Sequence, residues 1–93
     1  MCSRELLELR AIVKGDVQGI GFRAAVKRGA DQLELVGFTR NLSDGSVEIC
    51  AIGSKADLEK LLSKLLEIFK QNIEEISKDF HAVSQTYSSF LVK

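Results

Sequence analysis

Asp44 and Gly45 stand between two β-rich runs, and this pair constrains the fold more than any other feature of the sequence. The run before it is LVGFTRNL (35–42) and the run after it is SVEICAI (46–52). An Asp-Gly pair favours a tight hairpin because both of its residues can adopt positive φ. We therefore predict that the two runs form neighbouring antiparallel strands.

Helical patterns flank this hairpin on both sides. Before it, Phe22, Val26 and Leu33 recur at helical spacing, which predicts a helix over residues 22–33. After it, residues 54–57 (SKAD) are typical of a helix cap and introduce a second helix over residues 55–70. One face of that second helix carries Leu58, Leu61, Leu62, Leu65, Leu66 and Phe69. We expect both helices to bury their apolar faces in a common core.

Strands complete the order of elements at both ends of the chain. The run LELRAIVKG, which ends at Gly15, alternates like a half-buried strand. The runs NIEEISKDFHAV (72–83) and TYSSFLVK (86–93) indicate two more strands, of which the first is expected to be partly irregular. The order β-α-β-β-α-β predicts an α+β, ferredoxin-like fold, a split β-α-β sandwich with two helices on one face of an antiparallel sheet of four or five strands. The residues expected in its core are Leu9, Ala11, Val13, Val26, Leu62, Leu65 and Phe69.

Length and charge limit the classes of function. The chain has 93 residues with no proline, so one domain over residues 1–93 is expected. Its 13 basic and 13 acidic residues cancel, which argues against nucleic acid or an anionic membrane as a partner. The charged start and the lack of an apolar run of about 20 residues favour a cytoplasmic protein. A monomer is expected. Cys2, Cys50 and His81 are too few to hold zinc, so we expect reduced thiols and neither a metal nor a cofactor.

The stretch GDVQGIGFRAA (15–25) places three glycines where a strand turns into a helix. Glycine permits positive φ and lets N–H groups converge, and converging N–H groups at a helix start form an anion cradle. Arg23 follows in the first turn, where the helix dipole disfavours a cation unless an anion lies close. We interpret this stretch as a phosphate site; the plain alternative is a tight turn whose arginine reaches solvent. The candidate phosphate-binding residues are Gly15, Asp16, Val17, Gln18, Gly19, Ile20, Gly21, Phe22 and Arg23.

Other phosphate chemistries fit the sequence less well. Gly19, Gly21 and Ala24 match the dinucleotide pattern G-x-G-x-x-A, but that fold needs a parallel sheet, which the hairpin argues against. The P-loop's Gly-Lys-Ser/Thr does not follow the glycines, and Asp16 and Val17 stand where a cysteine phosphatase would need its nucleophile. Asp16 is conceivable as a phosphoryl acceptor, but no second carboxylate accompanies it to hold Mg²⁺.

Two motifs together carry a family resemblance. GDVQGIGFR is followed by LVGFTRNLSDGSVEICAIG, and this pair resembles the acylphosphatase signature. That signature is a Gly-x-Val-Gln-Gly-hydrophobic-x-Phe-Arg loop and a Gly-aromatic-x-x-Asn strand leading into an Asp-Gly hairpin. The match is continuous over residues 9–53 and looser beyond them. Two motifs at the right separation are far more specific than either alone.

The resemblance implies a hydrolase that splits small acylphosphates into a carboxylate and inorganic phosphate, without a metal or a covalent intermediate. It implies that Arg23 binds the phosphate, that the loop from Gly15 to Phe22 cradles it, and that Asn41 orients the attacking water. We expect Asn41 to face the loop because its strand would pair beside the first strand. The chain departs from the family pattern at Asp16, Ala24, Ala25, Leu42 and Ser54.

A binding or regulatory module is the alternative class of function. The open face of such a sheet can take nucleic acid or a partner, and related domains occur in larger carbamoyl-phosphate-handling maturation proteins. Nucleic-acid binding by a sheet needs exposed aromatics, and Phe38 is the one aromatic residue on the first three expected strands. A chain that the domain fills from end to end favours the free-standing enzyme. The remaining candidates are interpreted as structural or surface residues: Lys27, Arg28, Arg40, His81 and Tyr87.

Overall fold

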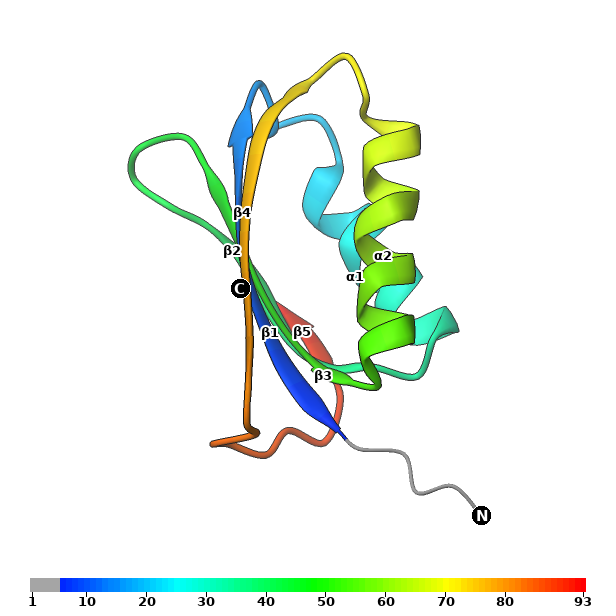
Figure 1. Ribbon diagram of the computed structural model, residues 1–93. Coiled ribbons are helices and arrows are strands. Elements are labelled where there is room, and N and C mark those ends of the chain that lie inside the picture. The colour runs from blue at the N-terminus through cyan, green and yellow to red at the C-terminus, as the bar shows by residue number, and fades with distance from the viewer. Residues whose placement is uncertain (1–5) are drawn as a thin grey trace.

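The strands and helices follow the predicted order, with two strands after the second helix (Figure 1). The computed structural model describes residues 6–93, so the prediction for Cys2 lies outside the described residues. The elements are β1 (Leu7–Gly15), α1 (Phe22–Gln32), β2 (Val36–Asn41), β3 (Val47–Gly53), α2 (Lys55–Ile68), β4 (Ile73–His81) and β5 (Phe90–Val92). Neither helix in this part of the chain is long and apolar enough to cross a membrane.

The sheet is mixed, which corrects the expectation of a purely antiparallel one. Its strand order is β4-β1-β3-β2-β5, and β5 pairs with β2 in parallel. The order of the strands explains this direction. β4 runs antiparallel to β1, and β2 runs in the direction of β1 because both are antiparallel to β3. The chain reverses once more after β4, so β5 runs in the direction of β1 and is therefore parallel to β2.

Most of the predicted core is buried between one face of the sheet and the two helices. The expected residues that are buried are Leu9, Ala11, Val13, Val26, Leu62 and Leu65. Phe69 is only half-buried, and its ring packs edge-on against Phe22 with 5.0 Å between the centroids. Leu66 is 46% exposed, so its expected place on the buried stripe of α2 is wrong. It lies at the margin of the stripe, where it lines a groove between α2 and the outer strand β4.

Local signals in the sequence set the turn and the cap around β3. Ser54 caps α2, since its hydroxyl accepts from the Asp57 N–H at 3.2 Å. In the hairpin between β2 and β3, Gly45 has a φ of 93°, but Asp44 does not adopt the positive φ that an Asp-Gly pair permits. The Asp44 side chain instead accepts from the Ser46 N–H at 3.0 Å, which stabilises a longer loop over residues 42–46.

β4 is a regular strand of 9 residues, so the expected irregularity is confined to its start. The pairing of β1 with β4 shifts register between Lys14 and Gly15, and Gly15 then pairs with Ile73. β5 is shorter than the run that predicted it, because only residues 90–92 pair with β2.

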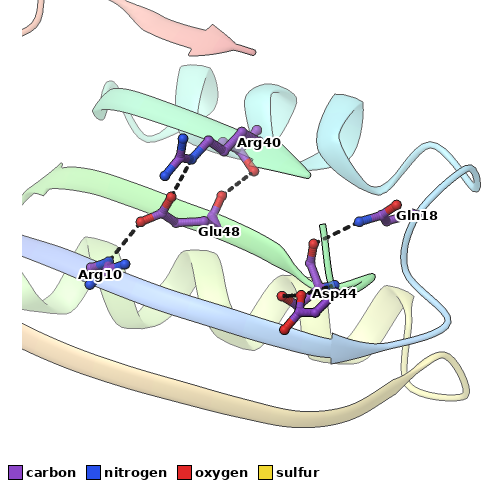
Figure 2. Close-up of polar contacts among 7 residues, drawn as sticks. Arg10, Gln18, Arg40, Asp44 and Glu48 are labelled. Carbon is purple, nitrogen blue, oxygen red and sulfur yellow. Dashed lines mark hydrogen bonds and ion pairs between the residues drawn. The ribbon is translucent and has the colours of Figure 1, made fainter. Parts of the chain in front are cut away.

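The face of the sheet away from the helices carries a buried carboxylate between two arginines (Figure 2). Glu48 accepts from the Nε of Arg10 at 2.8 Å and from the Nε of Arg40 at 2.6 Å. Burial favours the neutral form of Glu48, but the hydrogen bonds from Arg40 and Arg10 outweigh it and hold the pKa of Glu48 below its usual value. Arg40 is therefore a structural partner of β3.

The segment over residues 82–89, between β4 and β5, covers part of the same face. The Glu8 carboxylate accepts from the Ser84 N–H at 3.0 Å and from the Cys50 thiol at 3.3 Å. Tyr87 packs edge-on against Phe38, with 6.0 Å between the ring centroids, which agrees with the packing role expected for it. Burial and the neighbouring Glu8 raise the pKa of Cys50 to about 11, so this thiol stays protonated at neutral pH.

Candidate active site

Three strand ends meet at one end of the sheet, and the candidate residues follow them. β1, β2 and β5 run in the same direction, so their carboxyl ends lie together. The glycine loop follows β1, Asn41 is the last residue of β2, and Lys93 follows β5. The expectation that the strand of Asn41 pairs directly beside the first strand is wrong, because β3 lies between β1 and β2. Asn41 still lies at the same end of the sheet as the glycine loop, because β2 runs in the same direction as β1.

The loop over residues 16–21 enters α1 through two left-handed glycines. Gly19 has a φ of 78° and Gly21, the N-cap of α1, has a φ of 83°. Space for a Cβ is open at both positions, with no atom within 4 Å. Gly21 has no side chain with which to cap the helix, so N–H groups at the start of α1 can serve a ligand. The positive end of the helix dipole adds to their attraction for an anion.

A hollow of about 320 Å³ lies at this helix start. Its lining consists of Val17, Gly19, Gly21, Phe22, Arg23, Ala24, Lys27 and Val92. Val17 and Phe22 are each only 1% exposed, so the two flanks of the loop are anchored in the core. The exposed glycines between these anchors form the rim.

Arg23 lies in the first turn of α1 and lines the hollow. Its side chain is half-buried, and its Nη1 donates to the main-chain oxygen of Lys93 at 2.6 Å. This contact holds the guanidinium between the start of α1 and the segment after β5. A guanidinium carries five N–H donors, so one bond to Lys93 leaves donors for an anion.

Gln18 connects the loop to the hairpin that follows Asn41 (Figure 2). Its Nε2 donates to the main-chain oxygens of Leu42 at 2.8 Å and Ser46 at 3.0 Å. Leu42 is the residue next to Asn41, which is exposed at the end of β2 opposite Val47. Gln18 therefore ties the loop to the residue after Asn41, and Arg23 lines the hollow, whose lining does not include Asn41.

Gly15 and Asp16 belong to a different contact. The Asp16 N–H donates to the Asn72 oxygen at 2.9 Å, next to the place where Gly15 packs against β4. A second hollow, lined by Gly15 together with Asp44 and Glu74 among others, lies on that side of the loop. The hollow at Arg23 is formed by the later part of the predicted stretch.

Lys27 is a charged residue lining the hollow that the sequence interpretation did not include in the site. It was expected on a solvated face, and its side chain is 44% exposed, but its Nζ also donates to the Phe90 oxygen at 2.9 Å and pairs with Asp31 at 3.1 Å. The ammonium thus ties α1 to β5 beside the hollow. Its position four residues after Arg23 was the available signal, because residues at that spacing share a helix face. His81, in contrast, is exposed at the end of β4.

The described part of the chain has no cluster of three or more His, Cys, Asp or Glu side chains placed to hold a metal ion. The positive groups at the hollow are the Arg23 guanidinium and the Lys27 ammonium, together with the start of α1.

Fold and site define a small α/β sandwich with a glycine loop and an arginine at the start of its first helix. A family model described as Acylphosphatase matches residues 9–92. An acylphosphatase from Acaryochloris marina is 43% identical over 75% of this chain and 73% of its own length. One from Pasteurella multocida is 35% identical over 95% of this chain and 99% of its own. The crystal structure of acylphosphatase from Bacillus subtilis superposes with a TM-score of 0.84 at 32% identity, over 94% of this chain and 98% of that one.

The chain belongs to the acylphosphatase family, as the two motifs predicted, and it is a hydrolase of the acylphosphatase type. The ferredoxin-like fold is confirmed by the same comparison of structures.

Proposed function

We propose that this chain hydrolyses small acylphosphates, with Arg23 and the loop binding the phosphoryl group and Asn41 orienting the attacking water. The observation that carries the proposal is the placement of Arg23 in the first turn of α1, in a hollow rimmed by Gly19 and Gly21. Family membership supports the reaction class.

Phosphate binding follows from the positive groups at the hollow. Residues 18–22 lead into the start of α1 and supply main-chain N–H groups there, and Arg23 lines the same hollow. A guanidinium binds two phosphoryl oxygens at once and keeps its charge at any working pH. The N–H of Asp16 is engaged with Asn72, so we place the cradle after it and leave Gly15 and Asp16 to the contact with β4.

Water attack needs orientation more than it needs a strong base. An acylphosphate is a mixed anhydride whose carboxylate leaves readily, so positioning and charge stabilisation supply most of the catalysis. The Asn41 amide can accept a hydrogen bond from the water with its carbonyl oxygen and donate one to a phosphoryl oxygen with its NH₂. The plain alternative role for Asn41 is that of a turn residue ahead of the hairpin.

The two roles separate in a kinetic experiment on benzoyl phosphate. Arg23→Ala is expected to lose inhibition by inorganic phosphate together with turnover, because the guanidinium acts in both the ground state and the transition state. Arg23→Lys is not expected to restore activity, since an ammonium lacks the planar two-point contact. Asn41→Ala is expected to keep phosphate inhibition while kcat falls by about 100-fold or more, as for loss of one preorganised hydrogen-bonding group.

Controls make the outcome specific. Arg28→Ala removes an exposed arginine of the same helix and should leave turnover unchanged. Circular dichroism checks that each variant is folded, and excess EDTA should not alter the rate, because the proposed steps use only protein groups. If Asn41→Ala keeps most of its kcat, the role of Asn41 in orienting water is refuted. If Arg23→Ala still binds phosphate, the proposed phosphate site is refuted.

A further inference from the structure

The Gln18 amide donates to Leu42 and Ser46, the two residues that close the hairpin loop after β2. Leu42 and Ser46 already bond to each other, since the Leu42 N–H donates to the Ser46 oxygen at 2.8 Å. The Gly45 N–H also donates to the Leu42 oxygen, at 3.2 Å. The Gln18 NH₂ group adds one bond to each of these two oxygens, and a carbonyl oxygen has lone pairs for both partners. The hairpin is therefore hydrogen-bonded without Gln18, and the extra bonds serve to locate it.

These bonds link the two halves of the site through adjacent residues. Gln18 precedes Gly19, which rims the hollow, and Leu42 follows Asn41, which ends β2. Within residues 6–93, the hydrogen bonds between the loop and the hairpin are the two that Gln18 donates. The main chain of the loop is otherwise held on its far side, where Asp16 bonds to Asn72.

We propose that Gln18 is a positioning residue that sets the distance between the phosphate cradle and Asn41, an inference that rests on the proposed function. The side chain of Gln18 points to the hairpin and does not line the hollow, so it acts on the reaction through Asn41. Phosphate binding depends on Arg23 and on the main chain of the loop, which is anchored by the buried Val17 and Phe22. The side chain of Gln18 is not one of these groups.

The first measurement is a split between turnover and phosphate binding. Gln18→Met keeps the length of the side chain and removes both hydrogen bonds. We expect kcat on benzoyl phosphate to fall about 10-fold to 100-fold, because small displacements of an orienting group cost this much. The inhibition constant of inorganic phosphate should stay within about twofold, because the groups that bind phosphate remain. Gln32→Met, at an exposed position on α1, is the matched control and should change neither value.

The second measurement is a double-mutant cycle with Asn41→Ala. If Gln18 acts through Asn41, then Gln18→Met should lower kcat in the wild-type background and leave it within about twofold in the Asn41→Ala background. A residue with a merely structural role would lower kcat by the same factor in both backgrounds. Gln18→Asn, which keeps an amide but is one methylene too short to reach, repeats the test should Gln18→Met fail to fold.

The outcomes separate this inference from the proposed function. Equal factors in the two backgrounds, with Asn41→Ala itself impaired, overturn the role of Gln18 and leave that of Asn41 standing. An Asn41→Ala variant that keeps its kcat refutes the water-orienting role and the Gln18 inference with it. A rise of the phosphate inhibition constant in step with the loss of kcat also overturns the inference, because Gln18 would then hold the cradle.

Discussion

Gly15, Gly19 and Gly21 all have positive φ, of 135°, 78° and 83°, but their surroundings differ. A Cβ on Gly15 would overlap the carbonyl oxygen of Asn72 and lie 2.8 Å from the backbone nitrogen of Glu74. Both are backbone atoms of the segment that pairs with β1, so they cannot rotate away. At Gly19 and Gly21 the corresponding space is open. The first glycine permits close packing, and the other two shape an accessible loop.

Alanine at these positions is expected to separate packing from backbone strain. Gly15→Ala adds steric overlap to an unfavourable φ and should lower the free energy of unfolding by roughly 2–6 kcal/mol. Gly21→Ala meets only the left-handed strain and should cost about 1–2 kcal/mol. Urea unfolding of both variants measures the difference, with Ala24→Gly on the exposed side of α1 as a control for local helix propensity. Equal losses for Gly15→Ala and Gly21→Ala would contradict the distinction.

Residue identities predicted candidates for the site. The motifs make Arg23 and Asn41 the candidate catalytic residues, and the structure brings the segments that carry them to one end of the sheet. The role of the Gln18 side chain could not be read from the sequence, because its acceptors are main-chain oxygens 24 and 28 residues away. Main-chain acceptors leave no trace in residue type. Gly15 is part of the predicted cradle because of its place in the glycine loop and in the family motif, and its packing role follows only from its neighbours in space.

At the scale of elements, patterns repeated within one element were predictive, and pairings between distant elements were not. The Asp44-Gly45 signal identified the β2–β3 hairpin, and residues 54–57 identified the start of α2, since both depend on neighbouring residues. β5 is a strand of only 3 residues, and its direction depends on the order of the whole sheet. The bond from Lys27 to the Phe90 oxygen was unpredictable for the same reason, because the two residues are 63 apart in the sequence.

The segment over residues 82–89 is fastened to β1 by a carboxylate, and this gives a prediction about pH. The Ser84 N–H is the main cause that lowers the pKa of Glu8, with help from Cys50, the Ser84 hydroxyl and the charge of His81, while burial opposes them. Because the folded-state pKa lies below the unfolded value of about 4.3, the stabilisation is present above that value and is lost as the pH falls through the folded-state pKa.

Glu8→Gln is therefore expected to destabilise the chain at pH 7 and to differ progressively less from the wild type as the pH falls below about 4.3. Urea unfolding at a series of pH values between neutral and acid gives the free energies to compare. Glu75→Gln, on the exposed β4, is the matched control and should stay parallel to the wild type throughout. A Glu8→Gln deficit that is the same at every pH would show that its loss is one of packing and not of charge.

At the scale of the molecule, the candidate site exists only when the sheet is assembled. Its parts come from the loop after β1, the end of β2 and the segment after β5, which are distant in the sequence. Arg23 bonds to Lys93, 70 residues away, and Gln18 bonds to Leu42 across another strand. An unfolded chain cannot present the loop, the guanidinium and the helix dipole together. A ligand of this site should therefore bind the folded state alone.

Inorganic phosphate is expected to raise the melting temperature, because ligand that binds only the folded state adds RT ln(1 + [L]/Kd) to stability. At ten times Kd this is about 1.4 kcal/mol, or roughly 6–11 °C for a domain of this size. Sodium chloride at matched ionic strength, with Arg23→Ala titrated in parallel, separates site binding from the general effect of salts. Asn41→Ala should keep the full shift, since Asn41 is assigned to water, and Arg23→Ala should lose it. If the melting temperature of Arg23→Ala still rises with phosphate, then phosphate binds somewhere other than the start of α1. If the melting temperature of the wild type does not rise, the proposed phosphate site is refuted.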